Sequence, residues 1–404
     1  MTTAQDTASA SPHSARDSLD LRPLLLANMG CTMAMMAFVV LIGPIARLLG
    51  MATWQAGAAV TVSGVVWVLL ARPWGRAADR LGRRRILLLG SAGFTVAYWL
   101  LCLLIDSALR LLPGATLAFI GLMLARGLIG AFYAALPVGG NALIADHVEP
   151  QQRARAMALL GAANAVGLVL GPALAALLAR YSLSLPFFAL SLLPACAFVV
   201  LLLKLKPRPL PHNHVSSAVR LGDPRLRRPL LVAFSAMLSV TVSQITVGFF
   251  ALDRLQLNST DAAQAAGIAL TMVGVALIGA QLLLRRLQWP PLRMIRVGAS
   301  VSALGFAAAA LAYSAPALWA CFFIAAGGMG FVFPAFSALA ANAMGPSEQG
   351  ATAGSISAAQ GMGAVIGPLA GTLVYALDPR LPFLAVAALL LLVGLWPAPA
   401  ARSD

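Results

Sequence analysis

The chain is poor in charge, and the few charges it has are unbalanced. Only 10% of its 404 residues are Asp, Glu, Lys or Arg, whereas a soluble globular domain carries about 25%. Of these residues, 13 are acids and 28 are bases. The scarcity excludes an ordinary soluble domain and indicates a protein whose main solvent is lipid.

Residues that hold metals or carry out covalent chemistry are also scarce. The four histidines lie in tails or predicted loops, and no nucleophile elbow or phosphate-binding loop appears. The four cysteines show no C-x-x-C spacing and all fall inside predicted apolar segments, as Cys31, Cys102, Cys196 and Cys321. Buried, unpaired thiols are the expected outcome. We therefore expect no metal, no cofactor and no enzyme active site.

Apolar residues, by contrast, make up 60% of the sequence, with a mean hydropathy of +0.87. Runs of about 20 apolar residues, long enough to cross a bilayer core as a helix, recur along the whole chain. They predict an all-α integral membrane protein. Its twelve expected spans lie roughly at 22–47, 54–74, 86–106, 115–145, 157–179, 183–203, 229–252, 263–284, 294–313, 315–343, 352–377 and 381–398.

A Gly-x-x-x-Gly-Pro signature occurs twice, about half a chain length apart. It stands at Gly167, Gly171 and Pro172 and again, 196 residues later, at Gly363, Gly367 and Pro368. This offset predicts two homologous six-span bundles, an architecture typical of secondary transporters. Each chain then holds both halves of its own pathway, so we expect a monomer.

The bundles are expected at 22–203 and 229–398, joined by a basic linker at 204–228. Residues 1–21 are polar and lack the pattern of a signal peptide, so we expect a disordered tail before a retained first helix. Residues 399–404 form a short second tail.

The net charge of +15 has a topological explanation. With the N-terminus in the cytoplasm, 22 lysines and arginines fall on the cytoplasmic side and five on the other. This asymmetry follows the positive-inside rule. We therefore expect a multi-pass protein of the inner (cytoplasmic) membrane with both termini in the cytoplasm, and no nucleic-acid partner.

The segment between spans 2 and 3 carries the most specific motif. Its glycines permit a tight turn, and its aspartate is surrounded by arginines. It resembles, at every fixed position, the G-x-x-x-D-R-x-G-R-R loop of the major facilitator superfamily, through Gly75, Asp79, Arg80, Gly82, Arg83 and Arg84. The resemblance implies that Asp79 contacts the start of span 11 and forms a gate between the two halves. The corresponding loop of the second half, 285–293, lacks the aspartate.

Arg126 is the one basic residue that the spans place well inside the membrane. Buried cations are costly and usually mark function. With Gly130, Arg126 resembles an R-x-x-x-G element of the same superfamily, in which the arginine is implicated in proton transfer. The alternative is an arginine that snorkels to the interface, because the start of span 4 is set by hydropathy alone.

The two glycine–proline signatures also resemble a motif of exporters in this superfamily. The first copy is partial, with Ala158 and Ala175 at two glycine positions, and the second is fuller, with Gly354 and Gly371. Small residues let helices approach closely, and proline loosens the backbone where a helix must flex. The resemblance implies the group of twelve-helix antiporters that export drugs or metabolites in exchange for protons.

Few polar side chains lie within the spans. Asn28 shares a helical face with Thr32, Met35 and Met36, which suits an amphipathic ligand. For each polar residue an interhelical hydrogen bond is the alternative to ligand contact. The residues expected to line the substrate or proton pathway are Arg126, Asn28, Asn141, Asn164, Gln244 and Gln360.

No acid falls near the middle of any predicted span. A cavity with Arg126 and no carboxylate favours anions. We expect proton-coupled export of an organic anion, such as an acidic metabolite or a carboxylate siderophore. The alternatives are a multidrug efflux pump for cationic compounds, an importer of a small organic solute, and a membrane enzyme or receptor on the same fold.

Overall fold

The computed structural model describes residues 20–112, 114–206, 223–284, 286–287, 289–345 and 348–396. Most of the predicted N-terminal tail and linker, and the C-terminal tail, lie outside these ranges. The first bundle comprises α1 (Arg22–Leu48), α2 (Thr53–Leu81), α3 (Arg83–Leu111), α4 (Ala115–Tyr133), α5 (Ala135–His147), α6 (Pro150–Ala179) and α7 (Leu185–Lys204). After a 3-10 turn, η1 (Pro224–Leu226), the second comprises α8 (Arg227–Asp253), α9 (Ser259–Leu284), α10 (Pro291–Ala310), α11 (Ala315–Asn342), α12 (Gln349–Tyr375) and α13 (Leu381–Leu395).

The all-α membrane fold is confirmed. In the described ranges, 11 helical segments are long and apolar enough to cross a membrane, and α13 is a shorter apolar helix. Local sequence starts several of these helices. Proline occupies the first turn of α1, α7, α10 and α13. A backbone N–H at these positions would have no partner within the helix, so its absence in proline costs no hydrogen bond. Ser314 caps α11 by accepting a hydrogen bond from the Ala317 N–H.

The predicted fourth span, 115–145, is one membrane segment, Ala115–His147, with a single turn residue, Ala134, between α4 and α5. One boundary differs from expectation. The turn predicted between spans 2 and 3 is much shorter, because α2 continues to Leu81 and α3 begins at Arg83. Gly75 therefore lies inside α2, and Gly82, with φ of 93°, is the turn residue. Glycine adopts this positive φ without steric penalty because it has no Cβ.

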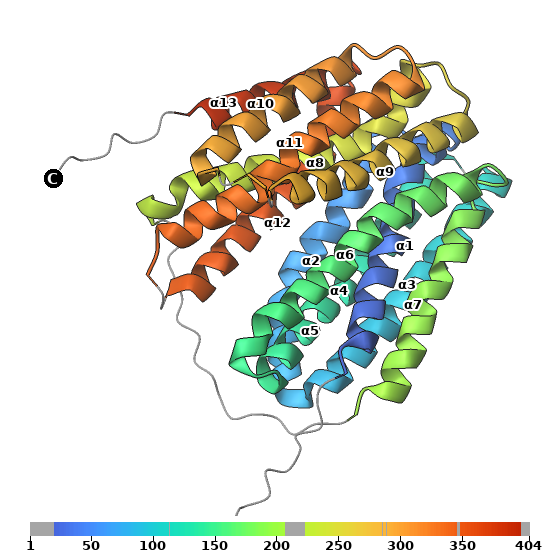
Figure 1. The fold of residues 1–404 in the computed structure, drawn as a ribbon. Coiled ribbons are helices and arrows are strands. Elements are labelled where there is room, and N and C mark those ends of the chain that lie inside the picture. The colour runs from blue at the N-terminus through green and yellow to red at the C-terminus, as the bar shows by residue number, and fades with distance from the viewer. Residues whose placement is uncertain are drawn as a thin grey trace, which may run out of the picture.

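The two bundles meet at one side of the molecule and splay apart at the other (Figure 1). The splayed side, here called the linker side, carries the start of α1, the α2–α3 turn and the end of α13. The contacts between bundles are made by α1, α2 and α6 with α8, α9 and α12. These six helices, three from each bundle, form the interface between the bundles.

Within each bundle, the Gly-Pro helix packs tightly against the first helix of that bundle. A Cβ at Gly167 would lie 2.8 Å from the Met29 carbonyl oxygen in α1. A Cβ at Gly363 would lie 2.6 Å from the Phe234 carbonyl oxygen in α8. These approaches are closer than any side chain permits, so glycine here sets the helix spacing.

Gly363→Ala should separate α12 from α8 and lower stability by about 1–3 kcal/mol, the usual cost of overpacking. The measurement is thermal unfolding of the purified protein in detergent. Gly354→Ala is the matched control, because a Cβ at Gly354 in the same helix meets nothing within 4 Å. Equal melting temperatures for the two variants would contradict this packing.

Candidate functional site

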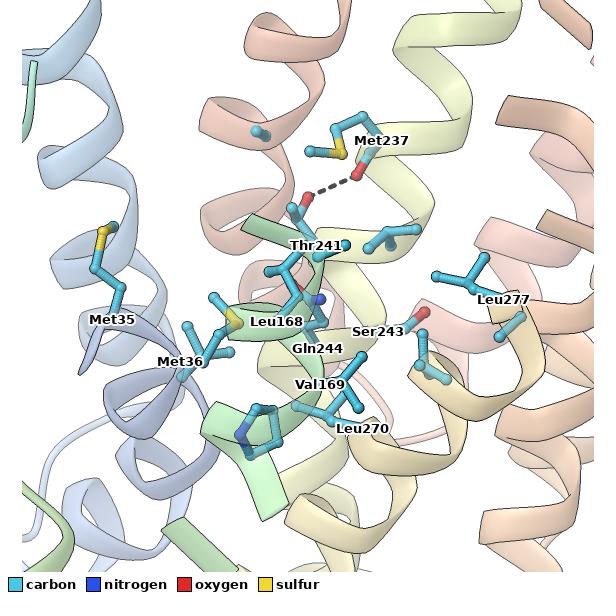
Figure 2. A pocket seen from close by; sticks show the side chains of 18 of the residues that line it. Met35, Met36, Leu168, Val169, Met237, Thr241, Ser243, Gln244, Leu270 and Leu277 are labelled. Atoms are coloured by element: carbon cyan, nitrogen blue, oxygen red, sulfur yellow. Dashed lines mark hydrogen bonds between the residues drawn. The ribbon is translucent and has the colours of Figure 1, made fainter. Parts of the chain in front are cut away.

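A cavity of about 940 Å³ lies between the two bundles. Figure 2 shows side chains from both bundles around it, among them Met36 of α1, Leu168 of α6, and Thr241 and Gln244 of α8. Most of the lining is aliphatic, aromatic or methionine. Methionine adapts to irregular ligand shapes, so the cavity suits a bulky apolar or amphipathic molecule.

Arg126 lies in the wall of this cavity and is 1% exposed. Its Nε donates to the Ala59 carbonyl oxygen of α2 over 3.4 Å, and its Cζ lies 4.4 Å from the ring centroid of Phe38 in α1. Its Nη1 has no hydrogen-bond partner. In the described part of the chain no carboxylate forms an ion pair with it. Such burial does not fit an arginine that snorkels to the interface.

Gln244 of α8 also lines the cavity, as do Tyr133 and Gln281. Its side chain is half-buried, and no described residue forms a hydrogen bond with its amide. Of the six residues expected along the pathway, the structure brings Arg126 and Gln244 together at one cavity.

The other four lie elsewhere, which corrects the expectation. Asn28 donates to the Leu160 carbonyl oxygen over 3.0 Å, and Asn164 accepts from Thr32 over 2.6 Å. Both amides therefore hold α1 against α6. Asn141 is exposed on α5, Gln360 is half-buried on α12, and neither lines the cavity.

The α2–α3 turn does not make the contact that its motif implies. The Asp79 side chain is 63% exposed and pairs with Arg83 of its own bundle over 2.5 Å. Arg83 also pairs with Asp146 over 2.8 Å. Because the bundles are splayed on this side (Figure 1), the start of α12 stands apart from the turn. Of the remaining motif arginines, Arg84 donates to the Leu205 and Leu202 carbonyl oxygens at the end of α7, and Arg80 is exposed.

The opposite side is closed by an ion pair between the bundles. Arg47, in the last turn of α1, lies 2.5 Å from Asp253 at the end of α8. Tyr375 at the end of α12 donates to the same carboxylate oxygen over 2.9 Å. Three helices from the two bundles therefore converge on one carboxylate.

A repeated motif that the sequence reasoning missed lies where the bundles cross, and its last glycine lines the cavity in each copy. Gly-x-x-x-Thr-x-x-Gly occurs in α2 at Gly57, Thr61 and Gly64, and in α9 at Gly267, Thr271 and Gly274. A Cβ at Gly57 would lie 2.6 Å from the Pro368 carbonyl oxygen, and one at Gly267 would lie 2.8 Å from that of Pro172. Each copy thus crosses the glycine–proline kink of the other bundle. The two copies lie 210 residues apart, and a search of the sequence for repeats at that offset would have found them.

The two crossings differ in hydrogen bonding. The Thr61 hydroxyl donates to the Val365 carbonyl oxygen over 2.9 Å and accepts from the Leu369 N–H over 3.2 Å. It is therefore inserted into the backbone ladder of α12 next to Pro368. The Thr271 hydroxyl instead bonds to Gly267 of its own helix over 2.7 Å. The α2–α12 crossing is hydrogen-bonded, whereas the α6–α9 crossing relies on small residues.

Comparison with known proteins now identifies the family. The model of the Major Facilitator Superfamily matches residues 24–368 and 293–402. The chain belongs to the Major Facilitator Superfamily. It is therefore a membrane transporter rather than an enzyme, and the resemblance stated from the sequence is confirmed.

Relatives of this superfamily member include efflux proteins. The class G tetracycline resistance protein of Vibrio anguillarum is 27% identical over 79% of this chain and 80% of its own length. Multidrug resistance protein 1 of Bacillus subtilis (strain 168) is 27% identical over 81% of this chain and 83% of its own.

Solved structures share the fold. An inward-facing, unoccupied bacterial homologue of the human lysosomal transporter Spinster has a TM-score of 0.74 at 15% identity, over 93% of this chain and 94% of that one. The human organic anion transporter MFSD10 has a TM-score of 0.64 at 21% identity, over 93% and 99%.

Asp253→Ala should weaken closure on the side opposite the linker, because it frees both Arg47 and Tyr375. The measurement is the distance between spin labels placed across that side, one on each bundle, which should broaden toward longer values. Asp106→Ala is the control, since Asp106 pairs only with Arg110 within α3 on the same side. Unchanged distances in Asp253→Ala would show that the ion pair does not hold the bundles together.

Proposed function

We propose that this transporter is a secondary active exporter of amphipathic organic anions, driven by inward movement of protons. The single observation that carries the proposal is Arg126, a buried cation without a carboxylate partner among the described residues, in the wall of a mostly apolar cavity. Burial strengthens the electrostatic interaction of Arg126 with a ligand, because the local dielectric constant is low. Binding of an anion is therefore stabilised at this position, and binding of a cation is destabilised. One buried cation suits a compound of one or two charges better than a siderophore with many carboxylates.

The direction of transport rests on the charge asymmetry and on the relatives. The linker side carries the basic α2–α3 turn, and the positive-inside rule places that side in the cytoplasm. The described state is then inward-facing, with the cavity open to cytoplasmic substrates and the Arg47–Asp253 side closed toward the exterior. The tetracycline and multidrug resistance relatives favour export over import. The proton coupling rests on the resemblance to antiporters.

Asp79 acts, in this proposal, as the gate of the opposite state. When the linker side closes, the start of α12 at Gln349 approaches the α2–α3 turn. A carboxylate at a helix N-terminus is favoured by the dipole and by the free N–H groups of the first turn. Asp79 would then exchange its bond with Arg83 for this contact. Its high exposure in the splayed state leaves it free to do so.

A second candidate is efflux of cationic amphipathic drugs. The name of the multidrug resistance relative favours drug efflux in general, and so does the lining of Met35, Met36, Met237 and Met329, which fits many shapes. Arg126 opposes it, because a cation in the cavity would meet an uncompensated like charge. The two candidates therefore differ in the sign of the preferred charge.

Replacing Arg126 tests the anion proposal. Arg126→Gln should reduce binding of the fluorescent amphipathic carboxylate dansylglycine by about tenfold or more, because a close buried charge contributes upwards of about 1.4 kcal/mol. Arg126→Lys, which keeps the charge, should retain most of the affinity. Equal affinities for wild type and Arg126→Gln, measured by dansyl fluorescence with purified protein, would remove Arg126 from the substrate site.

Replacing Asp79 tests the gate. Asp79→Asn should slow transport severalfold while leaving the melting temperature nearly unchanged, because the exposed Asp79–Arg83 pair contributes little to stability. Transport into inside-out vesicles and thermal unfolding provide the two readouts. Normal turnover at normal expression would show that Asp79 has no gating role.

A further inference from the structure

We infer that Gln244 is the residue that sets charge selectivity on the second bundle's side of the cavity. It supplies a neutral amide to the cavity that Arg126 also lines, where a carboxylate would admit cations. The inference deepens the proposed function and rests on it, since it takes the substrate to span the cavity between the two bundles. The substrate class is then an amphipathic anion that carries a neutral hydrogen-bonding group, such as a carbonyl, hydroxyl or sulfonamide, away from its charged end.

Gln244 and Arg126 lie at similar depth in the cavity and come from different bundles. Arg126 is eleven residues into α4 from Ala115. Gln244 is nine residues before Asp253, where α8 ends on the same, closed side of the molecule. At a rise of about 1.5 Å per residue, both lie roughly 14–16 Å from that side. One is contributed by the first bundle and the other by the second, so a ligand between them touches both.

The amide of Gln244 is also free, unlike its polar neighbours on α8. Thr241 donates to the Met237 carbonyl oxygen over 3.0 Å, as drawn in Figure 2, and Ser243 donates to that of Ser239 over 2.8 Å. Both hydroxyls thus already donate within α8. The Gln244 amide offers two donors and an acceptor with no partner among the described residues. A half-buried amide in this state gains from a ligand that pairs with it.

The residues around Gln244 make ligand binding sensitive to the sign of any charge placed at position 244. Met36 and Leu168 line the cavity together with Gln244 (Figure 2), and most of the lining is apolar, so a charge at this position is only weakly screened by the protein. In the described chain, the acids lie in turns or near helix ends, and no carboxylate lines the cavity. Glutamate has nearly the shape of glutamine, so Gln244→Glu would add one negative charge with little change in packing. The result would be a cavity with a cationic wall and an anionic wall.

The experiment compares two dansyl probes that share a sulfonamide and differ in charge, dansylglycine (anionic) and dansylethylenediamine (cationic). Binding to the full-length protein in lipid nanodiscs is followed by dansyl fluorescence. Gln244→Glu should weaken dansylglycine about tenfold and strengthen dansylethylenediamine about tenfold, the scale of a unit charge roughly 10 Å away in a site of intermediate dielectric. Gln244→Leu should weaken dansylglycine about fivefold, through the lost hydrogen bond, without any gain for the cation.

The matched control is Gln281→Glu. Gln281 lines the same cavity but is exposed, three residues from the linker-side end of α9. Solvent screens a charge there, so the preference between the probes should change less than about threefold. A shift in Gln244→Glu no larger than that in Gln281→Glu overturns the assignment of Gln244. If Gln244→Glu does not fold, Gln244→Leu decides, and wild-type affinity for dansylglycine in that variant overturns the assignment.

These outcomes separate the two proposals. A wild-type preference for dansylethylenediamine would overturn the anion proposal by itself. The role of Gln244 is judged from how much more Gln244→Glu changes the preference between the two probes than Gln281→Glu does. This comparison holds whichever probe the wild type prefers. A large difference supports Gln244 as the selectivity residue even then.

Discussion

A guanidinium buried without a counter-ion is the feature on which the properties of the cavity depend. Removing an ion from water costs several kcal/mol even after the protein relaxes. The contacts of Arg126 recover only part of this, because a desolvated cation–π contact such as that with Phe38 contributes about 2 kcal/mol and the bond to the Ala59 carbonyl is long. The remaining penalty makes the cavity wall a site that an anion stabilises. Relief of this penalty therefore contributes to the binding free energy of an anionic substrate.

The helix crossings between the bundles relate Arg126 to the transport cycle, because they join the two halves that enclose its cavity. Pro368 lacks an N–H, and Thr61 of the other bundle is inserted into the ladder beside it, so α12 is weakened where the bundles touch. At the pseudo-symmetric crossing, α6 and α9 meet through Pro172 and Gly267 without such a bond. The α2–α12 crossing is therefore the more firmly bonded of the two contacts. The cavity lies directly on the linker side of both.

The fold was largely predictable from the sequence, whereas the pairing of polar groups was not. Hydropathy and the repeated glycine–proline signature predict a duplicated bundle of twelve spans, because length and apolarity alone decide what crosses a bilayer. The break at Ala134 and the continuation of α2 through Gly75 depend on packing, which hydropathy does not report. Arg126 could be picked out because a cation well inside an apolar span is costly and is rarely kept without a function.

The partners of the amides and of Asp79 in the described state could not be read from the sequence. In the sequence, Asn28, Asn164 and Gln244 look alike, because each is an amide within an apolar span. In the structure, Asn28 and Asn164 form hydrogen bonds between α1 and α6, whereas the Gln244 amide has no partner among the described residues. The choice depends on which helix face meets a neighbour. For Asp79 the described state shows the pair with Arg83, whereas the gate contact that we propose belongs to the opposite state of the cycle.

Proton-driven uptake into inside-out membrane vesicles that contain the wild-type protein tests the export of anions directly. Dansylglycine and dansylethylenediamine are compared with and without an imposed proton gradient. A buried, unpaired Arg126 in the cavity wall predicts gradient-dependent accumulation of the anion and little of the cation. Accumulation of the cation alone would contradict anion export and make this protein a pump for cationic drugs.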